Sequence, residues 1–263
     1  MNATRLFTIA LLLAATPALA FQDPPDEVPA DQVPDKREEI KQMIERFEAH
    51  AKERGEQDEE AVAVIDQLYQ EFPNSGPKDR QDIVDALEDV FKLRRKELEE
   101  GVPDNRLYMA AAVALKDMGP ESVKPLIGLL EGKNIKDDLA VRRRVILSLG
   151  ETAHPKGMEP LADLLKDHEP QIQGAAAEAL GEFESRPQED RKELFGELLK
   201  TLMTALSAMQ KDPQDLVSRQ RYDTIAGPII TSLQRLSGHD ERDPAEWQSW
   251  WNNHKRDNWD EKE

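Results

Sequence analysis

Apolar residues recur at helical spacing along almost the whole chain from Lys36 onward. In the N-terminal half they lie three and four positions apart, as one buried stripe of an α-helix requires. Three such stripes are Ile40, Met43, Ile44 and Phe47; Val62, Ile65, Leu68, Tyr69 and Phe72; and Ile83, Val84, Leu87, Val90, Phe91 and Leu98. No stretch alternates apolar and polar residues in the manner of a half-buried strand. The pattern therefore predicts an all-α protein without β-strands.

The centre of the chain repeats one helical pattern three times. Trios of apolar residues spaced i, i+4, i+8 occur 34 and then 31 residues apart. They are Leu107-Ala111-Leu115, Val141-Val145-Leu149 and Ile172-Ala176-Leu180. An acid stands three residues before each trio, as Asp104, Asp138 and Glu169. A carboxylate there caps the first N–H groups of a helix or favours its positive end. Gly150 and Gly181 directly follow two of the trios and predict helix ends.

A second set of helices accompanies the trios, with proline in the first turn, where its missing N–H costs little. The matching residues are Pro125, Leu126, Leu129 and Leu130 in one unit and Pro160, Leu161, Leu164 and Leu165 in the next, 35 residues later. Each unit is a pair of short antiparallel helices that cannot bury its apolar stripe alone. Stacked pairs share one core, so we expect a right-handed α-α superhelix, a short solenoid. The default surface for a partner is a groove lined by the second helix of each pair.

The central helices resemble a known repeat family. Residues 138–151 (DLAVRRRVILSLGE) and 175–182 (AAAEALGE) are similar to the second helix of successive HEAT repeats. The resemblance implies that Asp138 and Arg142 bridge neighbouring repeats. The next unit departs from this pattern, because Ile172-Gln173 replaces Val141-Arg142.

The resemblance is clear over residues 105–181 and weaker over 37–251, and the tail around Trp247–Trp251 resembles the closing segment of exported bacterial HEAT-repeat proteins. HEAT-like repeats specify a fold well and a function poorly.

The sequence divides into six segments. Residues 1–20 are a signal peptide, and residues 21–35 are a disordered linker rich in proline and acid. Residues 36–100 are N-terminal helices packed on the solenoid, and residues 101–186 are the core HEAT-like repeats. Residues 187–238 are a long helical hairpin, interrupted or kinked at Gly227-Pro228, and residues 239–263 are a Trp-rich cap with a polar tail.

The first twenty residues have the layout of a secretory signal peptide. Arg5 gives a positive start, residues 6–15 form an apolar run, and Pro17–Ala20 ends in the small residues of a cleavage site. We therefore expect export to the periplasm or the extracellular space, with a mature chain that begins at Phe21. The alternative is an N-terminal helix retained as an anchor, although the run is short for a membrane span.

Composition narrows the classes of partner and of chemistry. The formal net charge is −18, and removal of the single positive charge of Arg5 with the signal makes it −19. Such a surface repels phosphate backbones and anionic lipid, so we expect no nucleic acid and no stable membrane insertion after signal removal. The chain has no cysteine, which excludes disulfides, thiolate catalysis, cysteine zinc sites and a lipid anchor on cysteine.

The sequence carries no recognisable catalytic, cofactor or metal motif. Its five histidines form no H-E-x-x-H pattern, and no P-loop, G-x-S-x-G or G-x-G-x-x-G occurs. A zinc site assembled from separate turns, such as His154 with His168, is the alternative to histidines that are simply exposed. We expect no enzyme activity and no cofactor.

Two features are candidates for partner binding. Within the run Arg142-Arg143-Arg144, Arg143 and Arg144 flank the core stripe, where they either face a partner carboxylate or neutralise a helix surface through pairs within the chain. Trp247, Trp250 and Trp251 share one helix face that begins near Asp243-Pro244. This face is either an aromatic platform for a ligand or a cap over the open end of the solenoid.

The sequence thus favours an exported, non-catalytic scaffold that binds a protein partner of basic character. Two alternatives come from other classes: a structural protein of the cell envelope, and an enzyme subunit such as those bilin lyases that carry HEAT-like repeats.

Overall fold

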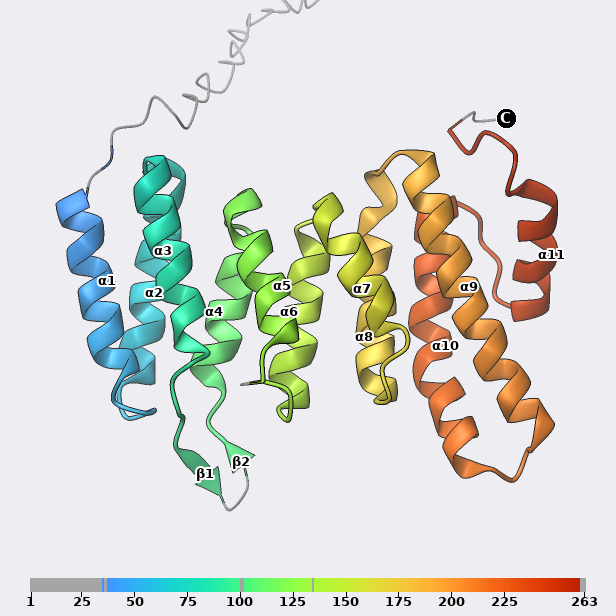
Figure 1. Ribbon diagram of the computed structural model, residues 1–263, viewed down its shortest axis with the longest axis horizontal. Coiled ribbons are helices and arrows are strands. Elements are labelled where there is room, and N and C mark those ends of the chain that lie inside the picture. Colours follow the sequence, from blue (N-terminus) through green and yellow to red (C-terminus); the bar gives the residue numbers. More distant parts are fainter. Residues whose placement is uncertain (1–34, 36, 100–101, 134, 261–263) are drawn as a thin grey trace, which may run out of the picture.

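The computed structural model describes residues 35–260 except 36, 100–101 and 134, so the predicted signal peptide and most of the predicted linker lie outside the described residues. The predicted all-α solenoid is confirmed, because successive helices stack as antiparallel pairs in one elongated array (Figure 1). The helices are α1 (Arg37–Ala51), α2 (Asp58–Glu71), α3 (Pro77–Val90), α4 (Arg106–Lys116), α5 (Val123–Glu131), α6 (Leu139–Glu151), α7 (Met158–Leu164), α8 (Pro170–Gly181), α9 (Gln188–Lys211), α10 (Leu216–Ser237) and α11 (Pro244–His254). Among the described residues, single 3-10 turns precede or follow some of these helices, at Phe72–Asn74, Gly119–Ser122, Pro155–Gly157 and Glu182–Ser185.

The array has two layers. The helices α2, α4, α6, α8 and α10 form the even row, in which each helix packs against the next. The helices α1, α3, α5, α7 and α9 form the odd row, which covers the other side of the core (Figure 1). The apolar trios of the sequence are the buried stripes of α4, α6 and α8.

Small residues let the even row pack closely in the C-terminal half. A Cβ atom added to Gly150 of α6 would lie 2.6 Å from the Cα atom of Ala179 in α8, closer than two carbon atoms can approach. At Gly181 the same atom would lie 2.7 Å from the hydroxyl oxygen of Ser232 in α10. That hydroxyl donates a hydrogen bond of 2.7 Å to the carbonyl oxygen of Ala177, so α8 and α10 are joined by a polar contact inside the core.

The starts of α6, α10 and α11 are capped by aspartate. Asp138 accepts a hydrogen bond of 3.0 Å from the N–H of Val141, and Asp243 accepts one of 2.7 Å from Ala245, which confirms Asp138 as a cap and Asp243-Pro244 as a helix start. Asp104 does not cap α4, whose N-cap is Asn105 without a side-chain cap hydrogen bond. Glu169 precedes α8 without a side-chain cap, because glutamate is one methylene longer than aspartate and favours the helix end through its charge alone.

Three expectations were wrong. The chain has a two-stranded antiparallel hairpin of β1 (Glu97–Glu99) and β2 (Val102–Pro103) between α3 and α4. Strands of two and three residues are too short to show an alternating pattern. Leu98 accordingly lies on β1 and not on the stripe of α3, which ends at Val90. Lastly, the interruption expected at Gly227-Pro228 does not occur, because α10 runs through Pro228; a kink there stays a prediction.

Candidate interaction surface

The arginine run on α6 divides between the core and the surface. Arg142 is buried and donates a hydrogen bond of 2.5 Å to the carboxylate of Asp167, in the loop between α7 and α8. Burial alone would raise the pKa of Asp167, but the N–H of Glu169 and the guanidinium of Arg142 hold it below its ordinary value. Asp138 caps its own helix and also accepts a hydrogen bond from the amide of Asn105 before α4, while Arg142 reaches the loop before α8, so the two residues contact different neighbours.

The candidate residues Arg143 and Arg144 both make ion pairs within the chain. Arg143 contacts Glu178 of α8 at 3.2 Å, and both side chains are about half exposed. Arg144 contacts Glu151 at 2.5 Å on its own helix, and Lys116 of α4 contacts the same carboxylate at 2.8 Å. Burial would raise the pKa of Glu151, but these two cations hold it low. Together with Lys116 these ion pairs join α4, α6 and α8, and a partner that used the arginines would first have to displace these acids.

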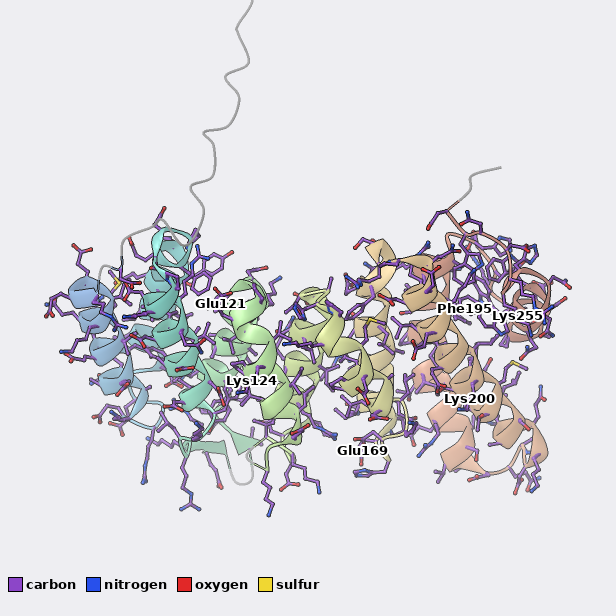
Figure 2. All side chains as sticks on the ribbon, turned by 45° about the horizontal axis from the view of Figure 1, so that its top comes forward. Glu121, Lys124, Glu169, Phe195, Lys200 and Lys255 are labelled. Atoms are coloured by element: carbon purple, nitrogen blue, oxygen red, sulfur yellow. The ribbon has the colours of Figure 1, made fainter. Side chains whose placement is uncertain are left out.

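The tryptophans form a cluster around one phenylalanine. Phe195 of α9 lies at the C-terminal end of the array (Figure 2), within 4.9 to 5.6 Å of the rings of all four tryptophans, measured between ring centroids. Trp247 is fully buried, and Trp250 and Trp251 are partly buried against the core. Contact with Phe195 occupies these rings, so the cluster covers the last helix pair as a solenoid cap does.

A buried arginine is one of the residues of α9 that hold the tail after α11, together with Lys192 and Gln188. Arg191 of α9 donates a hydrogen bond of 2.9 Å to the carbonyl oxygen of Leu236 and also pairs with the carboxylate of Asp260. It lies 5.9 Å from the ring centroid of Trp259, within the range of a cation–π contact. The tail is therefore held against both α9 and α10.

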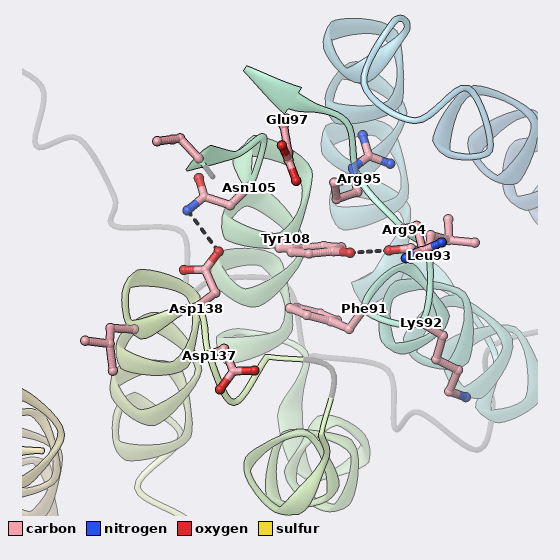
Figure 3. A pocket seen from close by; sticks show the side chains of 12 residues that line it. Phe91, Lys92, Leu93, Arg94, Arg95, Glu97, Asn105, Tyr108, Asp137 and Asp138 are labelled. Atoms are coloured by element: carbon pink, nitrogen blue, oxygen red, sulfur yellow. Dashed lines mark hydrogen bonds between the residues drawn. The ribbon is translucent and has the colours of Figure 1, made fainter. Parts of the chain in front are cut away.

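A hollow of about 770 Å³ lies at the edge of the array between α4 and α6, beside the hairpin (Figure 3). Its lining residues are Phe91, Lys92, Leu93, Arg94, Arg95, Glu97, Val102, Asn105, Tyr108, Asp137, Asp138 and Leu139. They come from the end of α3, the hairpin, the first turn of α4 and the loop before α6. This place differs from the groove along the second helices that the sequence suggested as the default.

An aromatic pair forms the floor of the hollow. The rings of Phe91 and Tyr108 are stacked with centroids 5.3 Å apart, and the Tyr108 hydroxyl donates a hydrogen bond to the carbonyl oxygen of Leu93 (Figure 3). Burial raises the pKa of Tyr108; the charge of Arg95 lowers it and that of Asp138 raises it, so both charged groups act on the ring from nearby. The tyrosine is therefore a neutral, fixed side chain at neutral pH.

A buried ion pair supports this floor from below. The guanidinium of Arg95 pairs with Asp58 at the start of α2 and donates a hydrogen bond of 2.9 Å to the carbonyl oxygen of Ala51. Both charged side chains are almost completely buried, which is tolerated because each has its counter-charge. The arginine of the Arg94-Arg95-Lys96 run thus anchors the chain that leads into the hairpin.

The hairpin exposes apolar side chains next to the hollow. Leu98 is 61% exposed and Val102 is 49% exposed. Exposed apolar residues beside an open hollow are typical of a contact surface. Sequence reasoning missed this site because Leu98 matched the helical spacing of α3, although the dipeptide Glu100-Gly101 after it was a signal for a turn.

Within the described residues, no group of three histidine or acidic side chains is arranged to hold a metal ion. His154 accepts a hydrogen bond from the N–H of Lys156, and His168 lies 3.3 Å from Asp167. None of the described helices has the length and apolar character needed to cross a membrane.

Comparison with known proteins agrees with the repeat pattern. Residues 128–217 match the family model for HEAT repeats, a segment that runs from within α5 to the start of α10. No curated protein sequence matches the chain. The match supports a HEAT-repeat family for the central part of the array, and HEAT repeats generally mediate protein–protein interaction.

Proposed function

We propose that the chain is an exported, non-catalytic scaffold that binds a protein partner through the hairpin and the hollow beside it, which we call the hairpin surface (residues 91–98, 102, 104–108 and 137–139). The observation that carries the proposal is the exposure of two apolar residues of the hairpin: Val102, which lines the open hollow, and Leu98, which lies on the same hairpin outside that lining. Burial of these side chains in a complex would remove apolar area from water and favour association. The net charge of −18 disfavours nucleic acid as the partner and favours a basic protein.

The partner is tested by affinity capture from an extract of the cells that make the protein, with a matched pair of variants. Leu98→Ser with Val102→Ser should abolish capture of a stoichiometric partner. Leu216→Ser with Val217→Ser is the control, because these residues are 73% and 70% exposed at the start of α10, far along the array from the hairpin (Figure 1). If both double variants retained the partner, the hairpin surface would not be the contact; if the wild-type chain retained none, the scaffold function would fail.

Export is tested separately, because its support lies in residues 1–20, outside the described part of the chain. The full-length protein would be expressed in a bacterium and its N-terminus sequenced. A periplasmic or secreted product that begins at Phe21 is expected. A cytoplasmic product that retains residues 1–20, or a membrane-bound one, would overturn the proposal of export.

A further inference from the structure

Two imidazole rings stack on one indole at the C-terminal end of the array. The ring centroids of His239 and His254 lie 5.1 Å and 5.0 Å from that of Trp250, and each imidazole is inclined by only 14° to the indole. His239 belongs to the loop after α10, and His254 is the last residue of α11. Two separate segments therefore place a titratable ring against the same aromatic side chain.

The polar contacts of both histidines suit a positively charged ring. The Nδ1 atom of His254 donates a hydrogen bond of 2.8 Å to the carbonyl oxygen of Trp250, at the end of α11, where the helix dipole attracts a cation. The Nε2 atom of His239 donates one of 3.2 Å to the carboxylate of Glu241. Because carbonyl and carboxylate oxygens only accept, each of these nitrogens carries a hydrogen. Uptake of a proton at the other ring nitrogen then makes the ring a cation.

A charged imidazole binds the face of an indole more strongly than a neutral one does. The face of an aromatic ring is negative, so it attracts a cation in addition to the dispersion contact that a neutral ring makes. Histidine is the side chain that changes its charge between about pH 5 and 8. Mild acid should therefore strengthen the contact of both rings with Trp250.

The other charged groups beside the stack act on its two sides differently. The loop before α11 and the first turn of that helix contribute one cation, Arg242, and four acids, Asp240, Glu241, Asp243 and Glu246. Glu241 raises the pKa of Glu246, so these two carboxylates lie close together and add to the negative charge near His239. At the other side, Lys255 and Arg256 follow His254 and are exposed, so they oppose a further positive charge there.

The charged groups of the helices packed against the cap have partners of their own. In α9, Arg191 and Lys192 lie 5.9 Å and 5.4 Å from the ring centroid of Trp259, and Arg191 also pairs with Asp260. Near the end of α10, Arg235 pairs with two acids, Glu182 and Glu184. These groups keep their charge between pH 5 and 8. The two histidines are therefore the groups of the stack that change charge in this range.

We propose that the C-terminal cap, which consists of α11 and the residues on both sides of it (239–260), is a pH-sensitive latch that mild acid closes through His239 and His254. While both imidazoles are neutral, the cap is held more weakly on Phe195 (Figure 2), and its release uncovers this ring and the last helix pair. The inference goes beyond the proposed function, which depends on the hairpin surface between α3 and α4.

Tryptophan fluorescence tests the latch selectively, because all four tryptophans of the chain lie in the cap. Urea unfolding of the full chain is followed by this fluorescence at about pH 5.5 and about pH 7.5. Far-UV circular dichroism reports the helices of the whole array in the same samples. The equilibrium constant for closing the cap should be about tenfold larger at the lower pH, since one cation–π contact at an exposed site corresponds to about threefold.

The two histidines are then removed one at a time. His239→Gln and His254→Gln should each reduce the pH effect to about threefold, and the double variant should abolish it, because glutamine does not titrate. His50→Gln is the matched control. This histidine lies near the end of α1, at the opposite end of the array (Figure 1), and its ring is hydrogen-bonded to Gln57. The control variant should retain the full pH effect.

Two outcomes would overturn the inference: a fluorescence transition with the same midpoint at both pH values, or a double variant that keeps the pH effect of the wild-type chain. A variant that loosens the cap at both pH values does not obscure the result, because the measured quantity is the difference between the two pH values for one variant. If fluorescence and circular dichroism give coincident transitions, the cap unfolds with the array, and the comparison of the double variant with His50→Gln still decides.

Discussion

The junction between α6 and α8 and the junction between α4 and α6 join similar helices and differ in what fills the space between them. The first has Gly150 against Ala179 and the buried pair of Arg142 with Asp167. The second has a polar contact in its core instead, since the hydroxyl of Ser148 donates a hydrogen bond of 2.6 Å to the carbonyl oxygen of Ala112. Its outer edge is open, however. One side chain per repeat therefore decides whether a junction is closed and rigid or available to a ligand.

The largest expected effect comes from opening the closed junction. Arg142→Ala should lower the free energy of unfolding by about 3 kcal/mol, because it leaves the carboxylate of Asp167 buried without its cation. Arg143→Ala is the matched control on the same helix; its pair with Glu178 is half exposed and should contribute less than about 1 kcal/mol. Denaturant unfolding measures both. Equal losses would show that the buried pair does not hold the junction.

A methyl group inserted into the closed junction should have the next largest effect. Gly150→Ala should destabilise the protein by about 2 kcal/mol, since its Cβ would overlap the backbone of Ala179. Gly128→Ala in α5 makes the same change where no atom lies within 4 Å. There alanine should stabilise the helix by up to about 1 kcal/mol. Thermal unfolding of the two variants should therefore shift in opposite directions, and a stable Gly150→Ala would disprove the close approach of α6 and α8.

Substitutions at the helix caps of the two junctions should change the free energy of unfolding by a smaller amount. Asp138→Ala should cost about 1 kcal/mol through loss of the bond to Val141. Glu169→Asp should stabilise α8 by about 0.5 kcal/mol, because aspartate can make the cap that glutamate does not. A destabilised Glu169→Asp variant would mean that the glutamate has a contact that the cap cannot replace.

Lowering the pH should gradually reduce the free energy of unfolding that the closed junction contributes, by a still smaller amount. The pKa of Asp167 is lowered in the folded state, so its stabilising contribution is present above the unfolded pKa of about 3.9 and is lost as the pH falls through the folded value. The gap in unfolding free energy between the wild type and Asp167→Asn should be constant near neutral pH and shrink below about pH 4. If this gap did not change with pH, the ionised carboxylate of Asp167 would not be the source of the stabilisation.

The sequence was informative wherever the structure follows from local spacing. The trios located the stripes of α4, α6 and α8, and Asp138 and Asp243 located two helix starts, because periodicity and capping depend on residues within one or two turns. The hairpin and the hollow could not be predicted. Leu98 fitted a helical stripe, and the outward turn of Tyr108 depends on the carbonyl oxygen of Leu93, which only the fold brings within reach.

The candidate residues show the same limit. Arg143 and Arg144 were expected to flank the core stripe, and their acids, Glu178 and Glu151, lie 35 and 7 residues away, so only the fold shows that Arg143 pairs with Glu178 of α8. The tryptophans were recognised as one helix face, but the residue that gathers them, Phe195, is on another helix.

Tyr108 of α4 stands where α6 has Arg142, one residue after the first member of its apolar trio, and this difference also bears on how the array loses its structure. In a solenoid each helix pair is stabilised by its neighbours alone, so cooperativity passes along the array through the junctions one at a time. The junction between α4 and α6 has the part-exposed pair of Lys116 with Glu151 but no buried pair like that of Arg142 with Asp167, so it should transmit less of this cooperativity. We therefore expect two foldons that meet between α4 and α6, with the C-terminal one retaining its amide protons longer in native-state hydrogen exchange. Uniform protection from α2 to α10 would mean that the core contacts alone suffice to make the array a single cooperative unit.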